Sequence, residues 1–353
     1  MSKYDRYTFI PQFSLTPNKL ALTNKVFVNQ ESNSVDNPYY DCKSDNPNRI
    51  KRVSSNNKVT RQFHNFKISQ NAHRNLKNKI NWLYFLSKSK YVKTYRGKEI
   101  FNFRIGFLTL TLPAKQKHPT IEITKEYFNQ LLTELRQRTK MQNYVWRLEF
   151  QKNGNVHYHL VTDTYLDFYF VRDIWNRILS KGGYIKDYQD RFKDLSLMEY
   201  VSKFNNNSKD NFNQLAKRYA LGKKNNWSKP NTVDVKSVVS NKSISNYISK
   251  YFSKDSDSNV YCNELDNEDN SKNLRLWFCS RSLSQLKSIS NYCEAIDWDC
   301  RSLVESIKDA KVKYYRYCCV IYFEIKKASN WIKSKLYKLF HEYSRNLGYI
   351  PSG

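Results

Sequence analysis

Residues 144–162 read YVWRLEFQKNGNVHYHLVT, and this stretch decides the fold of the chain's centre. Two runs rich in aromatic and β-branched residues, 144–151 and 156–162, flank the turn signal Asn153-Gly154. Such a pattern is typical of a β-hairpin. The stretch therefore predicts two neighbouring antiparallel strands.

The segments around this hairpin predict an α+β domain. Thr and Leu alternate over residues 104–113, which predicts a strand that stops at Pro113. A helix is predicted over 124–140, with Thr124 as its N-cap. The other predicted elements are helices over 72–88, 168–179 and 243–254 and strands over 184–188 and 232–239. We expect a central antiparallel β-sheet with helices packed on it.

The composition restricts the class of protein. The 353 residues contain 60 Lys and Arg against 32 Asp and Glu, a net charge of +28, and 15% of them are aromatic. Such an excess indicates a polyanionic partner, either nucleic acid or an anionic membrane surface. No apolar run is long enough for a transmembrane helix, and no secretory signal or Cys-x-x-Cys pair is present. We expect a cytoplasmic protein with reduced thiols.

We predict three consecutive segments. Residues 1–70 form a polar, loosely ordered arm in which Phe9-Ile10 and 26–28 could dock as short strands. Residues 71–262 form the central domain, with a polar insertion at about 189–230. Residues 263–353 form an aromatic and basic C-terminal region, with a helical pattern over 314–343. No phosphate-binding Gly-x-x-x-x-Gly-Lys-Ser/Thr loop is present, which argues against an NTP-driven helicase.

His157-Tyr158-His159 is the first candidate for chemistry. Side chains alternate along a strand, so both imidazoles point to one face, where they suit a divalent metal. With a three-residue loop, Glu149 would lie opposite His159 and on the same face as both histidines. The sequence thus predicts an Mg²⁺ or Mn²⁺ site of His157, His159 and Glu149. Solvated polar side chains on a hairpin are the simpler alternative.

The second candidate is the segment Ser243–Lys254, which reads SISNYISKYFSK. On a helix Tyr247 and Tyr251 lie one turn apart on one face, beside Lys250 and Lys254. A neighbouring cation lowers the cost of the phenolate, so Lys250 could activate a tyrosine nucleophile or hold a phosphate. The alternative is that both tyrosines simply pack on the sheet.

The order of these motifs resembles the HUH-type rolling-circle replication initiators, and among them the two-tyrosine Rep proteins of microviruses and related plasmids. The similar segments are FLTLTL at 107–112, NVHYHL at 155–160 and YISKYFSK at 247–254. WRLEF at 146–150 and RLWFCSR at 275–281 also resemble segments of this group.

The resemblance implies an HUH endonuclease with its nucleophile tyrosines on a helix. Tyr247 or Tyr251, assisted by Lys250, would nick one origin strand and form a 5′-phosphotyrosine and a 3′-OH primer, then rejoin the strand. Arg147, Lys254 and Arg281 would bind the DNA. The expected partners are single-stranded origin DNA and a host helicase and polymerase, in the cytoplasm of a bacterial host and away from membranes.

Three alternatives remain open at this level. Relaxases share the His-x-His chemistry but place the tyrosine ahead of the histidines, and single-tyrosine transposases are shorter. A basic protein could also bind single strands through its aromatic residues without cleaving them. A membrane-surface role would need an amphipathic basic helix, which residues 314–343 match loosely.

Overall fold

The computed structural model describes residues 7–28, 68–94, 100–205, 211–238, 274–291, 301–315 and 318–351. The chain divides into two compact units, each built from segments far apart in the sequence. Unit 1 contains residues 1–64 and 288–338, and unit 2 contains residues 65–287 and 339–353. The division into three consecutive segments stays a prediction.

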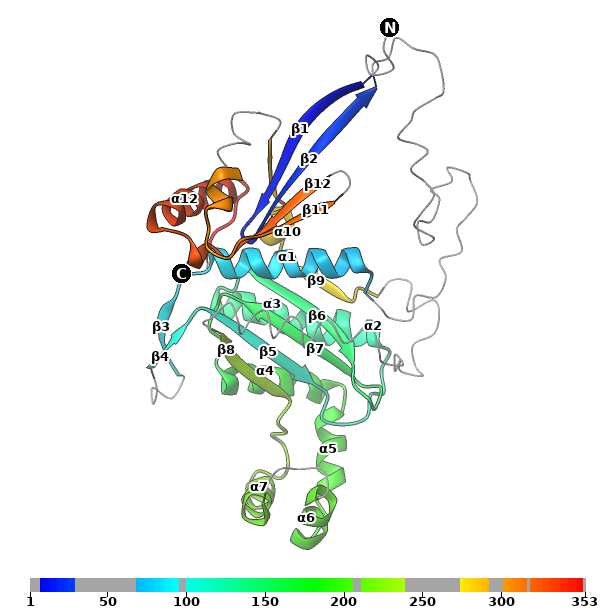
Figure 1. Ribbon diagram of the computed structural model, residues 1–353. Helices are drawn as coiled ribbons and strands as arrows, with labels where there is room; N and C mark the ends of the chain where they lie inside the picture. Colours follow the sequence, from blue (N-terminus) through cyan, green and yellow to red (C-terminus); the bar gives the residue numbers. More distant parts are fainter. Residues whose placement is uncertain are drawn as a thin grey trace, which may run out of the picture. The chain divides into compact units, whose positions relative to one another are not determined.

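The centre of unit 2 is an antiparallel sheet with strand order β8-β5-β7-β6-β9 (Figure 1). Its strands are β5 (Ile105–Thr111), β6 (Tyr144–Phe150), β7 (Val156–Thr162), β8 (Val233–Val238) and β9 (Trp277–Cys279). Every strand pair in this sheet is antiparallel. The predicted α+β class with a central antiparallel sheet is confirmed.

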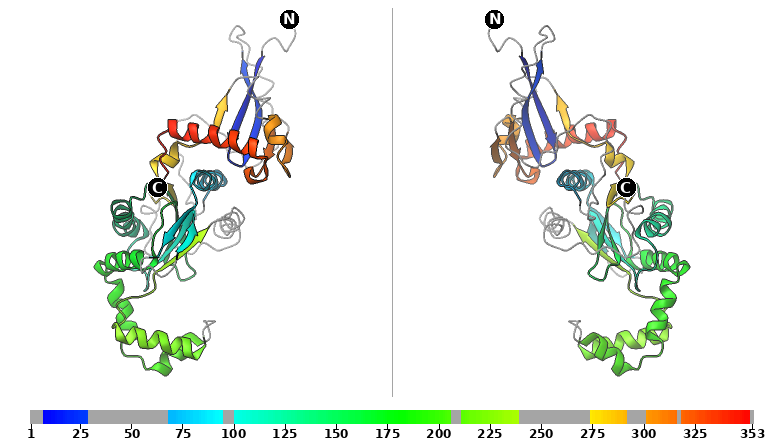
Figure 2. Two further views of the ribbon diagram at one scale, coloured as in Figure 1. Left: turned by 90° about the vertical axis from the view of Figure 1, so that its left-hand side faces the viewer. Right: turned by 90° about the vertical axis from the view of Figure 1, so that its right-hand side faces the viewer.

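One face of this sheet is covered by α3 (Asn129–Thr139) and α4 (Phe168–Lys181) (Figure 2). Both helices bury an apolar stripe at helical spacing, and these side chains form one core with Leu108, Tyr158 and Leu160 of the sheet. The ring of Tyr158 stacks on Phe128 with centroids 4.1 Å apart. Alternation along β7 therefore places Tyr158 and Leu160 in the core, and the residues between them on the other face.

Two local predictions in this layer were wrong. The helix over 124–140 begins earlier, with α2 (Thr120–Glu122) and the π-helical η1 (Ile123–Phe128), because Pro119 stands at its N-cap. Thr124 lies inside the helix and donates to the Thr120 carbonyl at 2.7 Å. The expected strand over 184–188 is α5 (Tyr184–Phe192), where the adjacent residues Tyr184 and Ile185 are both buried, a pattern that one face of a helix allows and one face of a strand does not.

Unit 2 contains further helices and strands besides this sheet and its two helices. Helix α1 (Gln70–Leu86) confirms the helix predicted over 72–88, and Trp82 and Phe85 pack edge-to-face on Phe340 with centroids 5.3 and 5.0 Å away. The remaining elements are β3 (Lys90–Lys93), β4 (Ile100–Phe103), α6 (Leu197–Asn205), α7 (Phe212–Lys224) and α10 (Arg281–Gln285). No helix in the described part of the chain is long and apolar enough to cross a membrane.

Unit 1 contains a second antiparallel sheet of order β10-β1-β2-β12-β11. Its strands are β1 (Tyr7–Thr16), β2 (Lys19–Val28), β10 (Ile289–Asn291), β11 (Lys311–Tyr315) and β12 (Cys318–Tyr322), followed by η3 (Ile325–Lys327) and α12 (Asn330–Asn346). Helix α12 passes into unit 2 at Leu339.

Two expectations about unit 1 were wrong. Residues 7–28 are not loosely ordered but form a long hairpin, because Phe13, Leu15 and Leu20 are buried; the expected strands at Phe9-Ile10 and 26–28 are part of this hairpin. Residues 314–343 are not helical throughout, because they begin with the β11–β12 hairpin, in which the β-branched Val320 and Ile321 are buried.

The insertion expected at about 189–230 forms α6 and α7 with a small aromatic core of its own, around Phe192, Tyr200 and Trp227. Gly222 on α7 lies directly under the ring of Trp227. A Cβ at this position would lie 2.3 Å from the ring atom Cζ3. The glycine is therefore required by close packing.

We expect Gly222→Ala to displace the Trp227 ring and destabilise the α6–α7 pair by about 1–3 kcal/mol. Hydrogen exchange should rise across residues 197–227 and stay unchanged in the central sheet. Leu221→Ala, at a neighbouring position that is 61% exposed, is the control. Unchanged exchange in the Gly222→Ala variant would contradict this packing argument.

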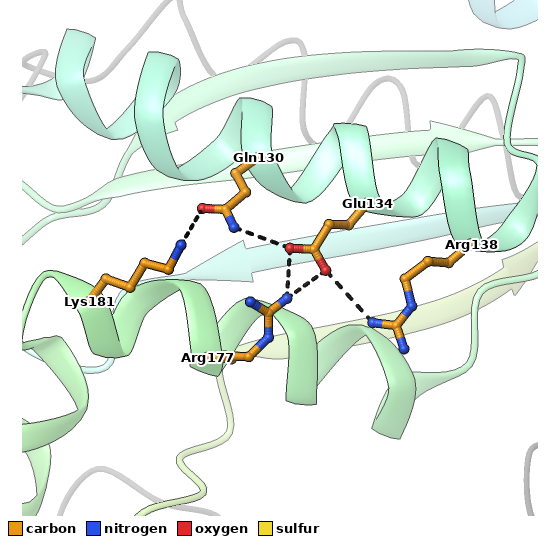
Figure 3. Close-up of polar contacts among 5 residues, drawn as sticks. All are labelled: Gln130, Glu134, Arg138, Arg177 and Lys181. Carbon is orange, nitrogen blue, oxygen red and sulfur yellow. Dashed lines mark hydrogen bonds and ion pairs between the residues drawn. The ribbon is translucent and has the colours of Figure 1, made fainter.

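A polar network joins the outer surfaces of α3 and α4 (Figure 3). Both carboxylate oxygens of Glu134 accept from Arg177, at 2.6 and 2.5 Å, and Gln130 donates to the same carboxylate at 3.2 Å. Burial acts to raise the pKa of Glu134, but the hydrogen bond and charge of Arg177, with smaller contributions from Gln130 and Arg138, outweigh it. The net pKa lies below its ordinary value of 4.5.

A carboxyl whose pKa is lowered by folding stabilises the protein above its unfolded pKa and loses this effect as the pH falls through the folded pKa. We expect Glu134→Gln to cost about 0.5–1 kcal/mol at pH 7, because the Arg177 side chain is 51% exposed and the pair is screened. The difference from wild type should shrink as the pH falls below 4.5. Urea unfolding from pH 7 to 3 measures it, with the exposed Glu126→Gln as control; a difference independent of pH would contradict the assignment.

Candidate nucleic-acid-processing site

The hairpin β6–β7 turns one residue earlier than predicted. Glu149 lies opposite His157, and Phe150 opposite Val156. The predicted pairing of Glu149 with His159 is therefore wrong. Gln151 donates its N–H to the Asn155 carbonyl at 2.9 Å, so the chain turns over 152–154 rather than 153–155, and Gly154 adopts φ +80° within this turn.

The error in register is two residues, and an even shift leaves every side chain on its predicted face. Glu149, His157 and His159 consequently share the sheet face that is opposite to α3 and α4. On β5, Thr109 pairs with His159 and Thr111 with His157, and both threonines face the same way. The structure thus brings together the three predicted ligands, although through another register.

The three side chains are in close contact. Nε2 of His159 lies 3.2 Å from Oε2 of Glu149, a diagonal contact across the two strands. The imidazole centroids of His157 and His159 are 4.6 Å apart. His159 is only 3% exposed, whereas His157 is half-buried.

Two further side chains orient the imidazoles. Oγ1 of Thr109 lies 3.4 Å from Nδ1 of His159, and the side-chain amide of Gln151 lies 3.1 Å from Nδ1 of His157. Contacts at Nδ1 fix the ring and leave its Nε2 edge for other partners. No role was predicted for Thr109 or Gln151 from the sequence. The period-two pattern of 107–112 places Thr109 on a defined face, but only the pairing of β5 with β7 identifies its partner.

The electrostatics of the cluster favour a neutral His157 and an ionised Glu149. Burial, followed by the charge of His159, lowers the pKa of His157 to about 4 despite the opposing effect of Glu149. Burial acts to raise the pKa of Glu149, but the hydrogen bond and charge of His159 and the charges of Arg147 and His157 lower it overall. A neutral imidazole beside a carboxylate is the protonation state that metal ligands need.

Arg147 lies on the same face, beside Glu149. Its side chain is 3% exposed, and its Nε lies 3.4 Å from Oε1 of Glu149. In this position Arg147 can orient the Glu149 carboxylate through their ion pair. Arg281, also predicted to bind DNA, is exposed at the start of α10. The DNA contacts of Arg147 and Arg281 stay predictions.

The chemistry of the cluster suits a divalent cation. Oε1 of Glu149 is buried and accepts no hydrogen bond from the described residues, although the Arg147 guanidinium lies 3.4 Å away as its ion-pair partner. The 3.2 Å between Nε2 of His159 and Oε2 of Glu149 is close to the roughly 3.0 Å between adjacent ligands of an octahedral ion with bonds of about 2.1 Å. Within the described ranges, however, no three His, Cys, Asp or Glu side chains are arranged as a formed metal site.

The structure does not describe the candidate nucleophiles. Tyr247, Lys250, Tyr251 and Lys254 lie outside the described residues. The last described residue before them is Val238, the end of the edge strand β8, which pairs with β5.

Residues 105–256 match a family model described as a replication-associated protein of the ORF2 type. The resemblance to Rep-type rolling-circle replication initiators is confirmed. The Rep-like segment runs from the start of β5 through both histidines and includes the tyrosine segment. No curated protein and no solved structure matches the chain significantly. The match supports a replication-associated initiator that binds DNA.

Proposed function

We propose that the chain is a site-specific DNA endonuclease and strand transferase that nicks one strand of a replicon origin and later rejoins it. One observation carries this proposal. The segment that matches a replication-associated family contains, on a single sheet face, a Glu149–His159 contact with His157 beside it. Rep-type initiators are generally endonucleases, and this is the donor set that phosphate chemistry requires.

We propose that His157, His159 and Glu149 hold Mg²⁺ or Mn²⁺ together with a DNA phosphate. When bound there, the ion supplies Lewis-acid polarisation of the scissile phosphate. Thr109 and Gln151 hold the two rings through Nδ1, and Arg147 holds the carboxylate beside them. These contacts restrict the side chains before the DNA arrives, which lowers the cost of ordering them.

We propose that Tyr247 or Tyr251 is the nucleophile. Its phenolate oxygen forms a bond to the phosphorus while the P–O3′ bond breaks, and the leaving oxygen takes a proton and becomes the 3′-OH primer. The 5′-phosphotyrosine keeps the energy of the broken bond, so rejoining needs no ATP. With two tyrosines four residues apart in the sequence, the second can attack after one round of replication and release a unit circle.

The biological setting follows from this chemistry and from the resemblance. The 3′-OH would be extended by a host DNA polymerase behind a host helicase, in the cytoplasm of a bacterial host. The order of motifs, histidines before tyrosines, argues against a relaxase, and the paired tyrosines argue against a single-tyrosine transposase. The remaining alternative, a non-catalytic single-strand binder, differs in one measurable respect, the covalent adduct.

Metal binding tests the ligand set directly. We expect Glu149→Gln to weaken Mn²⁺ binding by at least about 10-fold, and Thr109→Val to weaken it by about 10-fold through loss of its contact with His159. Isothermal titration calorimetry on the purified full chain measures both. Glu126→Gln, which removes an exposed carboxylate from η1, should bind Mn²⁺ like wild type. Equal Mn²⁺ affinity in Glu149→Gln and wild type would remove Glu149 from the site.

Adduct formation tests the reaction. Wild-type protein with Mn²⁺ and single-stranded origin oligonucleotides should form a denaturant-resistant protein–DNA adduct. The adduct should disappear in Tyr247→Phe/Tyr251→Phe and in His157→Ala, whereas salt-sensitive DNA binding should largely persist in both variants. Mass spectrometry of the adduct peptide identifies the attacking residue.

The control for the adduct is Tyr91→Phe, at a tyrosine that is 79% exposed on β3. It should form the adduct at the wild-type rate. An adduct that survives in the double tyrosine variant would refute the proposed nucleophiles. If wild type forms no adduct with any oligonucleotide of a set covering the whole parent replicon, the proposed reaction is refuted.

A further inference from the structure

Unit 2 contains a second candidate site, a cavity of about 390 Å³ at the edge strand β8. Gly106 and Leu108 of β5 line it together with Val235 of β8. Leu108 belongs to the core under α4, so the cavity lies on the α4 face of the sheet and not on the face of His157 and His159. Its volume falls within the range of about 300–1,000 Å³ that is typical of small-ligand pockets.

The walls of this cavity are mainly aromatic. Phe101 and Phe103 come from β4, Tyr165 from the loop after β7, and Phe168 and Tyr169 from the first turn of α4. Phe103 is buried and forms the floor, whereas Tyr169 is 36% exposed at the opening. Tyr165 contacts the rings of Phe101 and Phe103 edge-on, with centroids 5.5 and 5.7 Å away. We call this cavity the aromatic pocket.

Cations surround the aromatic pocket. The guanidinium of Arg172 lies 5.1 Å from the ring centre of Phe168 and 5.2 Å from that of Tyr169, and Lys90 lies 5.8 Å from that of Phe103. Lys236 of β8 follows Val235 in the strand, so its side chain points to the opposite face, where it pairs with Asp234 at 2.9 Å. Aromatic rings beside cations are the combination that binds single-stranded nucleic acid, because the rings stack on bases and the cations attract phosphates.

Asp167, one of the polar groups in the wall, has little hydrogen-bonding capacity left. Its Oδ1 caps α4 by accepting from the N–H groups of Tyr169 and Phe170, and its Oδ2 accepts from the hydroxyl of Tyr165 at 3.2 Å. Thr94 and Ser237 also line the pocket, but five of its lining side chains are aromatic, so a ligand would be held mainly by ring contacts. This favours a flat aromatic group over a sugar or an amino acid.

We propose that the aromatic pocket holds an unstacked nucleobase of the origin strand, at a distance along the DNA from the nucleotide that is cleaved. The inference rests on the proposed function, since its ligand is the same single strand. A strand crossing the edge at β8 passes from the face of the histidines to the face of the pocket, and Lys236 lies on this edge. The pocket would anchor the strand without taking part in the reaction.

The test uses Phe101→Ala/Tyr169→Ala in the full chain, with EDTA present so that no cleavage occurs. Both side chains are partly exposed, whereas the buried floor of the pocket is left intact. We expect the Kd for a single-stranded origin oligonucleotide, measured by fluorescence anisotropy, to rise by about 5- to 50-fold. Tyr91→Ala is the matched control, because Tyr91 pairs with Asn102 and so faces away from Phe101 on the same hairpin. Its Kd should stay within about twofold of wild type.

An abasic scan then identifies the bound base. In wild type one abasic position should weaken binding by a similar factor, and this loss should be absent from Phe101→Ala/Tyr169→Ala. An oligonucleotide with 5-iododeoxyuridine at that position should crosslink to the peptide that contains residues 165–169. Phe101→Tyr/Tyr169→Phe, which keeps both rings, should bind like wild type; this separates stacking from a general folding defect.

The proposal is overturned if the alanine variant binds as tightly as wild type, if both proteins lose affinity at the same abasic position, or if the crosslink maps outside the pocket. Its failure is distinct from failure of the nicking proposal. A normal adduct with unchanged Kd in the alanine variant would refute only the pocket. A wild-type protein without any adduct, but with a base-dependent Kd that the alanine substitutions abolish, would refute only the nicking.

Discussion

The antiparallel pairing of β7 with both β5 and β6 is the constraint on which the rest of unit 2 depends. It separates adjacent residues of one strand between two environments, because side chains alternate across a sheet. Tyr158 and Leu160 enter the core under α3 and α4, and their burial holds the strand in place. His157 and His159 are thereby fixed on the opposite face, beside Glu149. The aromatic packing of Tyr158 on Phe128 thus positions the polar cluster without touching it.

Much of this arrangement could be predicted from the sequence because it depends on periodicity. The alternation in 144–162 and 104–113 predicted the three central strands, and the side-chain period of two predicted the common face of the histidines. The predicted register was wrong by two residues, yet Glu149 kept its face because only an odd shift exchanges faces. The prediction that Glu149, His157 and His159 cluster on one face was therefore right, whereas the predicted pairing of Glu149 with His159 was wrong.

The remaining features depend on contacts between distant segments, which local patterns do not contain. Thr109 and His159 are 50 residues apart in the chain, and their contact exists only because β5 pairs with β7. Residues 7–28 were predicted as part of a polar arm because residues 1–70 as a whole are rich in Asn, Ser, Lys and Asp. Phe13 and Leu15 are buried only in the complete sheet, which includes β12 from the other end of the chain. Charge and composition could not reveal such a pairing.

The two faces of the central sheet have different chemistry, and this gives the charge of +28 a more specific meaning. One face carries imidazoles and a carboxylate, which act on a phosphate. The other carries aromatic rings with Arg172 and Lys90 nearby, which suit a base and its neighbouring phosphates. A single strand is flexible enough to contact both faces, whereas a rigid duplex is not. If the strand crosses at β8, binding energy gained at the rings orders the DNA at the histidines, so one sheet edge links recognition to cleavage.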